Sequence, residues 1–379
     1  MIGVIADDLT GAAEIGAAGL RHGLRAEVIV AGEPSGDADL ICVDTDSRSC
    51  DPTEAAQRAS NAALLLQNCG AEWIYKKTDS LLRGNVTREI EAMVKQLGLS
   101  GALLVPANPS LGRTVVNGQY FVRGQLIHQT EFARDPKHPR LSPNVLELLD
   151  KPLAFPIYVR KSFEPLPVYG IVIGEVAGSD DLRKWARLRD KSWLMAGGAE
   201  FFGALLKPGA PIPQTSPLPG KELFVCGSAS QATQNFVTGQ AQRGVPVFSL
   251  PDKLAMVGTF DSTEVDALAA RVVSALQAKP RVILHVGLPQ VRDVSLAEML
   301  ATHLVRVGEA VLRNAGVGHV FAEGGATAVA VARCMDWRRL AVKSELASGV
   351  VALSVIGGGS SLLTIKPGSY AWPEGVVNM

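Results

Sequence analysis

The 379-residue chain lacks the features that mark several large classes of protein. It has no run of about eighteen apolar residues that would span a membrane. Its first residues lack the basic, apolar and small-residue order of a secretory signal. Its 37 basic and 37 acidic residues cancel to a formal charge of zero, which argues against nucleic acid or anionic lipid as a partner. We therefore predict a cytoplasmic protein with no nucleic-acid and no membrane partner.

Cysteine and histidine are also scarce. The five cysteines form no C-x-x-C pair, and the six histidines are scattered. The spacing of these residues does not match a zinc site. An odd number of cysteines without a disulfide framework fits a reducing compartment. What is present is ordinary for a globular protein, with 47% hydrophobic and 20% charged residues, and the length suggests two or three domains.

Short apolar runs alternate with helical patterns along nearly the whole chain, which is typical of parallel sheets covered by helices. The clearest break is the segment 207–220, where five prolines in fourteen residues exclude a helix or strand interior. We predict an α/β protein with two Rossmann-like domains of parallel strands flanked by helices and an active site in the interdomain cleft. The expected parts are residues 1–206, the linker 207–220 and residues 221–379. Residues 114–168 are less regular and are predicted to be an elaborated loop region.

The stretch KKTDSLLRGN, residues 76–85, has a high density of side chains able to bind a ligand. It follows a strand-like run and precedes a helical pattern, and such strand-to-helix loops hold ligands in α/β proteins. Its guanidinium, ammonium and amide groups suit a carboxylate, while its hydroxyls and Asp79 suit a polyol. These groups favour a small hydroxylated acid. The alternative is a solvated loop whose charges pair with one another.

Polar residues follow four successive predicted strands of the first half. They are Asp7 and Asp8, then Asp44, Asp46 and Arg48, then Lys77, Asp79 and Arg83, and finally Asn108 and Arg113. The carboxyl ends of parallel strands lie along one edge of a sheet, so these loops are expected to converge on one crevice.

Glycine-rich turns follow predicted strands in the second half. Backbone N–H groups in such turns, at a helix N-terminus, hold phosphates. No G-x-x-x-x-G-K-[ST] motif occurs, and no G-x-G-x-x-G follows the first strand. Each turn alone is explained by a tight connection, but together they favour a nucleotide or another phosphorylated ligand. The candidate cofactor-binding residues are Ser228, Gly324, Gly325, Ala326, Thr327, Gly358, Lys366 and Gly368.

A hydroxy-acid crevice in one domain and a phosphate cradle in the other suggest phosphoryl transfer with ATP and Mg²⁺. Such transfer needs a base near the attacking hydroxyl, for which Asp7, Asp8 and Asp79 are the candidates. Two structural alternatives stay open. Asp8 can serve only as a helix cap, and Asp79 can serve only as a partner of Arg83.

Several strings closely resemble the motifs of the four-carbon acid sugar kinases. In the first half these are IADDLTGA (5–12), DTDSR (44–48), KKTDSLLRGN (76–85) and PANPSLGR (106–113). In the second half they are CGSAS (226–230), GGATA (324–328) and KPGSY (366–370). The resemblance implies ATP-dependent phosphorylation of tetronates such as threonate, erythronate or their 3-oxo forms. It also implies an N-terminal sugar-acid domain, a C-terminal nucleotide domain and a homodimer.

The same resemblance implies roles for single residues. Substrate contacts fall on Asp8, Ser47, Arg48, Lys77, Asp79 and Arg83, and nucleotide contacts on Ser228, on residues 324–327 and on Gly368. Two departures are visible: Ala326 stands where the family commonly has an acidic residue, and the segment 347–363 is unfamiliar. The competing hypotheses are a hydroxy-acid dehydrogenase and a non-catalytic sensor that binds a sugar acid.

Overall fold

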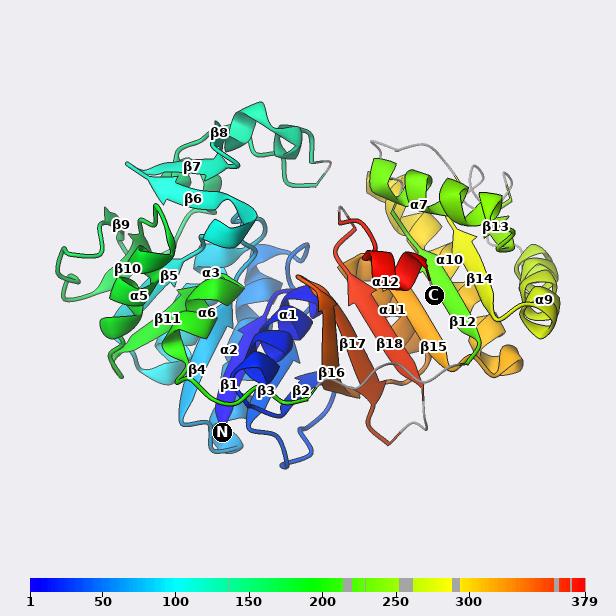
Figure 1. The fold of residues 1–379 in the computed structure, drawn as a ribbon. Helices are drawn as coiled ribbons and strands as arrows, with labels where there is room; N and C mark the ends of the chain where they lie inside the picture. Colours follow the sequence, from blue (N-terminus) through cyan, green and yellow to red (C-terminus); the bar gives the residue numbers. More distant parts are fainter. Residues whose placement is uncertain are drawn as a thin grey trace. The chain divides into compact units, whose positions relative to one another are not determined.

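The structure is a computed structural model that describes residues 1–135, 137–213, 220–228, 230–251, 262–287, 294–357, 361–368 and 370–378. Helices and strands alternate throughout (Figure 1). The chain divides into two compact units: Met1–Ile29 with Glu33–Ile212, and Val30–Gly32 with Pro213–Met379. Gly358 and residues 214–219 of the expected Pro-rich linker lie outside the described residues.

The first unit holds the elements from β1 to α6. Its strands are β1 (Ile2–Ala6), β2 (Ala26–Ile29), β3 (Leu40–Asp44), β4 (Trp73–Lys77), β5 (Gly101–Val105), β6 (Arg113–Val116), β7 (Gln119–Val122), β8 (Gln125–Leu126), β9 (Ile157–Arg160), β10 (Gly170–Gly174) and β11 (Trp193–Gly197). Its α-helices are α1 (Leu9–Arg21), α2 (Pro52–Asn68), α3 (Val86–Leu97), α4 (Val145–Leu148), α5 (Ser179–Arg187) and α6 (Ala199–Leu205). Short 3₁₀ turns cover Pro109–Leu111, Ile127–Gln129 and Glu131–Arg134.

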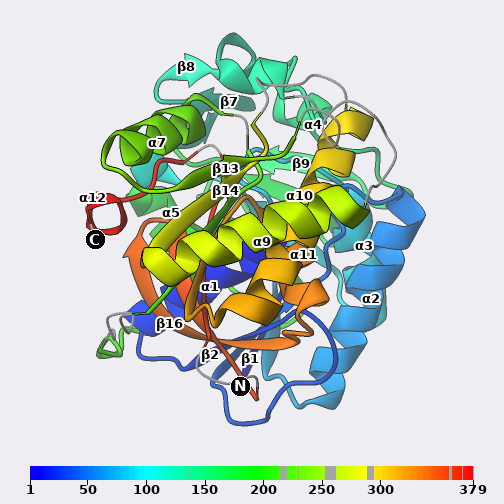
Figure 2. The same cartoon turned by 90° about the vertical axis from the view of Figure 1, so that its right-hand side faces the viewer.

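The main sheet of the first unit is parallel, in the order β2-β3-β1-β4-β11-β5-β10-β9. Most of its strands are buried along their whole length, as expected when helices cover both faces. Helices α2 and α3 lie side by side on one face (Figure 2), while α1 and α6 pack together on the other (Figure 1). Helix α2 starts where Asp51 accepts a hydrogen bond from the Thr53 N–H and Pro52 is the first helical residue.

Two features of this unit differ from the expectation. Strand β11 lies between β4 and β5, so only three of the four expected loops follow directly neighbouring strands. Residues 114–168 are also more ordered than predicted, because they contain β9 and an antiparallel sheet of β6, β7 and β8. The sequence pattern of these strands was weak because they have only two to four residues each.

The second unit holds the elements from β12 to α12. Its strands are β12 (Glu222–Cys226), β13 (Val247–Ser249), β14 (Arg281–His285), β15 (His319–Glu323), β16 (Arg339–Ala347), β17 (Val350–Val355) and β18 (Leu362–Lys366). Its helices are α7 (Gln231–Gln242), α9 (Ser262–Ala278), α10 (Val294–Ala315), α11 (Gly325–Cys334) and α12 (Glu374–Val377). The strand order is β13-β14-β12-β15-β18-β17-β16.

The expectation of purely parallel sheets is wrong for this unit. Strands β13, β14, β12, β15 and β18 are parallel, but β17 pairs with both β16 and β18 in the antiparallel sense. The cause is the short turn between Ala347 and Val350, with Gly349 at φ +74°, because so short a connection can join only antiparallel strands. The sheet is therefore mixed, and part of the unfamiliar segment 347–363 forms this hairpin.

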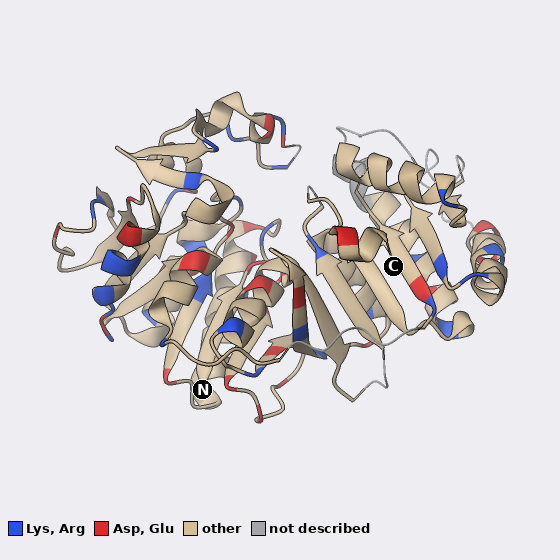
Figure 3. Ribbon diagram, in the orientation of Figure 1, with Lys and Arg blue, Asp and Glu red and all other residues tan. Residues whose placement is uncertain are grey.

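Charged residues of both signs are interspersed over the ribbon (Figure 3). Within the described ranges, none of the helices combines the length and the apolar character needed to cross a membrane.

Candidate functional site

The first cluster of polar side chains is built around Arg48, in the loop between β3 and α2. The N–H groups of Ser47 and Arg48 donate to the Asp7 carbonyl oxygen at 3.0 and 3.3 Å, which holds this loop against the end of β1. The Arg48 guanidinium binds the Asp7 carboxylate through Nε–Oδ2 and Nη2–Oδ1, at 2.7 and 3.0 Å. Its Nη1 lies 2.8 Å from Asp8 Oδ2, and its Nη2 lies 3.9 Å from Asp79 Oδ1. The structure therefore brings together the three aspartates that the sequence singled out.

Charge pairing shifts the pKa values of Asp7 and Arg48. Burial opposes the charge on Asp7, but the Arg48 guanidinium outweighs it and lowers the pKa of that carboxyl. Burial likewise opposes the charge on Arg48, and the neighbouring aspartates raise its pKa well above the ordinary value. The side chain of Asp8 is 17% exposed, against 5% for Asp7 and 8% for Asp79. Of these three carboxylates, Asp8 is therefore the one that a ligand reaches most readily.

A second guanidinium, that of Arg83, holds Asp79 from the other side. Its Nε and Nη2 lie 2.8 and 2.9 Å from the two Asp79 oxygens, and its Nη1 lies 2.9 Å from Asp135 Oδ2. The backbone N–H groups of Leu81 and Arg83 also donate to Asp79, which closes the turn. Burial opposes ionisation of Asp79, yet Arg83 and Arg48 hold its pKa well below the usual range. Asp79 therefore pairs with Arg83, as the structural alternative expected. It also lies close to Arg48.

The two adjacent lysines of the 76–85 loop serve opposite faces of the sheet. Side chains alternate along a strand, so Lys76 and Lys77 at the end of β4 point in opposite directions. The Lys77 ammonium lies 3.2 Å from Glu14 Oε2 on α1, whereas Lys76 forms an ion pair with Glu89 on α3. Burial opposes the charge on Lys77, but Glu14 raises its pKa. The structure therefore does not combine the two ammonium groups into one anion site.

Arg113 differs from these cations. Its guanidinium donates to the Ser80 hydroxyl and lies 5.9 Å from the centre of the Phe132 ring. Among the described residues, no carboxylate is paired with Arg113, whereas Arg48, Arg83 and Lys77 each have an acidic partner. Arg113 is thus the cation of the four loops that is best able to accept an anionic ligand.

Ser47 and Asn108 are placed inside the protein. The Ser47 hydroxyl donates to Glu89 Oε1 at 2.8 Å and is fully buried. The Asn108 side-chain oxygen accepts from the Glu200 N–H at 3.4 Å, at the start of α6. Both side chains therefore hold loops in place in this structure.

Sequence reasoning missed the acidic partners Glu14, Glu89 and Asp135. The glutamates lie on helices, and Asp135 lies in the region expected to be irregular. Strand alternation could have indicated that two consecutive buried lysines need partners on two different faces, although it could not have named the partners.

The second cluster is a group of turns at the ends of β12, β15 and β18. The last residues of these adjacent parallel strands, Cys226, Glu323 and Lys366, are cross-strand neighbours, so the following turns begin at one level. The turns then approach closely. A Cβ on Gly227 would lie 2.0 Å from Thr327 Oγ1, and a Cβ on Gly368 would lie 3.5 Å from the Ser228 side chain.

Hydrogen bonds fix these turns to one another. The hydroxyls of Ser228 and Ser230 donate to the Gly368 carbonyl oxygen at 3.3 and 3.1 Å. Ser230 also caps α7, and its hydroxyl lies 2.9 Å from that of Thr233, which in turn donates to Glu323. The arrangement is thus one connected cradle of backbone groups and hydroxyls.

Lys366 lies beneath this cradle. Its ammonium is 3.1 Å from Glu323 Oε1, and both side chains are buried. Burial lowers the pKa of Lys366, against the opposing effect of Glu323. The structure therefore places Lys366 in an internal ion pair that supports the turns.

The cradle has backbone features suited to phosphate binding. Gly324 at φ +92° opens helix α11, whose first turn presents backbone N–H groups not used within the helix. Ala326 is exposed on that turn, while Thr327 is buried against Gly227. Gly325 is the first helical residue. These positions supply N–H groups and little side-chain bulk, which is the requirement for close approach of a phosphate.

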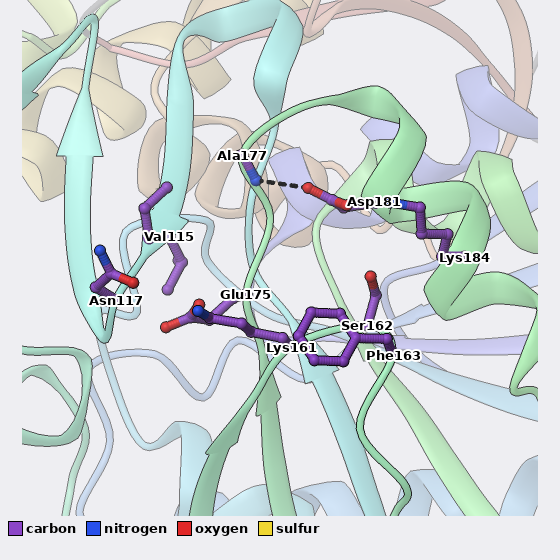
Figure 4. Close-up of a pocket in the computed structure, with 10 residues that line it drawn as sticks. Val115, Asn117, Lys161, Ser162, Phe163, Glu175, Ala177, Asp181 and Lys184 are labelled. Atoms are coloured by element: carbon purple, nitrogen blue, oxygen red, sulfur yellow. Dashed lines mark hydrogen bonds and ion pairs between the residues drawn. The ribbon is translucent and has the colours of Figure 1, made fainter.

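A separate pocket of about 250 Å³ lies at the ends of β9 and β10 (Figure 4). Lys161, Ser162 and Phe163 line one side, and Asp181 and Lys184 of α5 line another. Asp181 accepts a hydrogen bond from the Ala177 N–H at 3.0 Å and pairs with Lys184. Asp181 is thus already paired, and the pocket includes none of the residues around Arg48.

Comparison with known proteins matches both halves of the chain. Residues 2–205 match the family model of a sugar-binding N-terminal domain, and residues 223–370 match that of a nucleotide-binding C-terminal domain.

Curated relatives over most of the chain are sugar-acid kinases. A D-threonate kinase of Salmonella typhimurium is 29% identical, with 91% of this chain and 88% of the relative covered. A 3-oxo-tetronate kinase of Pseudomonas fluorescens is 27% identical over 98% of this chain and 94% of its own. A D-erythronate kinase of Heliobacterium modesticaldum is 27% identical over 94% of this chain and 90% of its own.

Solved structures have the same fold. One from Salmonella typhimurium LT2 has a TM-score of 0.78 at 20% identity and covers 98% of this chain and 96% of its own. Another, from Haemophilus influenzae, has a TM-score of 0.72 at 21% identity and covers 98% of this chain and 97% of its own. Together, the two matching domains and the kinases aligned along the chain show that this protein belongs to the four-carbon acid sugar kinase family.

Proposed function

We propose that the protein transfers the terminal phosphoryl group of ATP to a hydroxyl of a four-carbon sugar acid of the threonate, erythronate or 3-oxo-tetronate type. One observation carries the proposal. Three adjacent strand ends form a cradle of turns in one unit, in a chain whose other unit gathers aspartates around Arg48. In-line transfer requires the sugar acid and the terminal phosphate of ATP to meet.

The sugar acid is proposed to bind at the Arg48 cluster. Its hydroxyls would contact Asp8, the most exposed of the three aspartates, and its carboxylate would bind the guanidinium of Arg113. Asp8 is also the best placed to accept the proton of the attacking hydroxyl. Asp7 and Asp79 would orient Arg48, and Arg83 would hold Asp79. Ser47, Lys77 and Asn108 would support the loops, since their polar atoms already have internal partners.

The nucleotide is proposed to bind at the cradle of the second unit. Ser228 and Gly368 would form one wall, and residues 324–327 would bind phosphate oxygens through backbone N–H groups. Lys366 would support the turns through its buried ion pair with Glu323. Because Ala326 has no carboxylate, phosphate binding at this turn would depend on the backbone.

Mg²⁺ is proposed to arrive with ATP and to neutralise phosphate charge. Mg²⁺ typically takes one or two carboxylates and completes its shell with water and phosphate oxygens. Within the described part of the chain, no three Asp, Glu, His or Cys side chains are grouped to hold a metal ion, so we assign no residue to it.

The test is ADP release from the purified protein with ATP, Mg²⁺ and a panel of four-carbon sugar acids. Butyrate, which has the same number of carbons but no hydroxyl acceptor, is the matched control. We expect ADP release with at least one tetronate and none with butyrate. Tetronate binding by calorimetry without ADP release would support the sensor hypothesis instead. Turnover that needs nicotinamide and no ATP would support the dehydrogenase.

A further inference from the structure

Glu89 on α3 is a buried carboxylate that the proposed chemistry does not use. Its Oε1 accepts a hydrogen bond from the Ser47 hydroxyl at 2.8 Å, and its Oε2 forms an ion pair with Lys76. Both charged side chains are only 1% exposed. Burial raises the pKa of Glu89, and the Lys76 ammonium opposes that rise. An acid–base pair is therefore enclosed next to the loop that carries Arg48.

Ser47 connects this pair to Arg48. Its hydroxyl binds Glu89, its N–H donates to the Asp7 carbonyl oxygen at 3.0 Å, and its carbonyl oxygen accepts from the Asn85 amide at 3.2 Å. All the hydrogen-bonding groups of Ser47 are thus fixed, and the next residue along the chain is Arg48. Movement of Ser47 would move the guanidinium that binds the aspartates.

Stability does not account for a charged pair at this position. The desolvation of two buried charges offsets much of their attraction, and apolar replacements of similar volume are often neutral or stabilising. The neighbouring α3 residues Ile90, Met93 and Val94 already pack in the hydrophobic core. An apolar residue at position 89 would remove the carboxylate acceptor of the Ser47 hydroxyl and leave that hydroxyl with the Thr45 hydroxyl, 2.7 Å away.

We propose that Glu89 is a positioning residue for the transfer reaction, which holds Ser47 and through it Arg48 in register with Asp7. Lys76 forms the ion pair with Glu89 Oε2 and so fixes the direction of that side chain. This inference rests on the proposed kinase function for its kinetic test, and on the hydrogen bonds alone for its structural test.

Two matched double variants separate positioning from burial. Lys76→Met with Glu89→Gln removes both charges but keeps a side-chain oxygen at position 89 that accepts from Ser47, whereas Lys76→Met with Glu89→Leu removes that oxygen as well. Because a small misplacement of catalytic groups costs about 10²-fold in rate, we expect the Leu variant to have a kcat/KM for the sugar acid on the order of 10²-fold below that of the Gln variant. The affinity for ATP should be equal in the two.

Glu91 provides a single-site control on the same helix. Its buried carboxylate accepts from the N–H groups of Leu153, Ala154 and Phe155 and does not contact the Arg48 loop. Glu91→Gln is therefore expected to lower the melting temperature without changing kcat/KM.

Hydrogen exchange gives a readout that does not depend on turnover. The Ser47 and Arg48 amides should exchange faster in the Leu variant than in the Gln variant. Equal exchange and equal kcat/KM in the two would overturn the positioning role. A parent enzyme that releases no ADP would instead overturn the proposed function, and the exchange comparison would still decide the role of Glu89.

Discussion

The guanidinium of Arg48 and the carboxylate of Asp7 form a two-point contact, at 2.7 and 3.0 Å, between residues 41 positions apart in the chain. This contact ties the loop after β3 to the end of β1, and a third nitrogen of the same guanidinium reaches Asp8. A planar donor group is needed to make all these contacts at once.

Arg48→Lys should therefore impair the enzyme although it keeps the charge. A lysine ammonium cannot bind two oxygens of Asp7 and one of Asp8 in the same geometry. We expect kcat/KM for the sugar acid to fall on the order of 10²-fold, with the ATP affinity retained. Arg25→Lys is the matched control, because Arg25 also pairs through two nitrogens with an aspartate, Asp39, but on the surface. Equal effects of the two substitutions would contradict the role of Arg48.

Arg113→Ala should weaken binding of the acid itself. If Arg113 holds the ligand carboxylate, loss of a charge-assisted hydrogen bond costs about 1.5–3 kcal/mol, or roughly 10- to 100-fold in affinity. Calorimetry with a tetronate measures this change, and ATP affinity should stay the same. Arg187→Ala, at an exposed position of α5, is the control. Unchanged tetronate affinity would assign the carboxylate to another cation.

Gly324→Ala should affect the nucleotide side. A Cβ is unfavourable at φ +92°, so the turn that opens α11 would shift. We expect ATP affinity to fall about tenfold, equivalent to ~1.4 kcal/mol, with tetronate affinity unchanged. Gly239→Ala on α7 is the control, since a Cβ there meets open space. An equal loss of tetronate and ATP binding would contradict the assignment of one ligand to each unit.

Acid should destabilise the first unit. Burial opposes the charge on Asp79, yet Arg83 and Arg48 hold its pKa well below the ordinary value of 3.8. The unfolded chain takes up a proton near that ordinary value, so the stabilisation is complete above it and is lost as the pH falls toward the lower folded-state pKa. The free energy of unfolding should therefore decline below about pH 4.

Asp79→Asn checks this linkage. We expect the variant to lose about 3–5 kcal/mol at neutral pH, because its arginine partners stay behind, and to show a shallower decline in acid. Denaturant unfolding at several pH values measures both quantities. Asp180→Asn, at an exposed ion pair on α5, is the control. If the acid slopes of wild type and Asp79→Asn coincide, the folded-state pKa of Asp79 is not depressed.

Much of the fold could be predicted because buried parallel strands have a simple signature. Ile2–Ala6 and Leu40–Asp44 are short apolar runs followed at once by polar residues, and Asp51 with Pro52 marks a helix start. The insertion of β11 and the antiparallel β16–β17 hairpin could not be predicted in this way. Strand order depends on contacts between residues far apart in the chain, and such contacts leave no local pattern.

The site shows the same division. Its residue types, and their position just after strands, could be predicted from the motif at residues 76–85 and from the pair Asp7 and Asp8. The partners were not. Glu14, Glu89 and Asp135 became part of the site only because the helices and loops that carry them pack against the sheet.

The amino-acid sequence by itself determined which charged and hydroxyl groups are available and that they stand at strand ends, because residue type and periodicity are local properties. Only the tertiary structure decided which cation meets which carboxylate. Lys76 and Lys77 are neighbours in the chain, yet one pairs with a glutamate of α3 and the other with a glutamate of α1. The physical reason is that side chains alternate across a strand, so consecutive residues meet different packing layers.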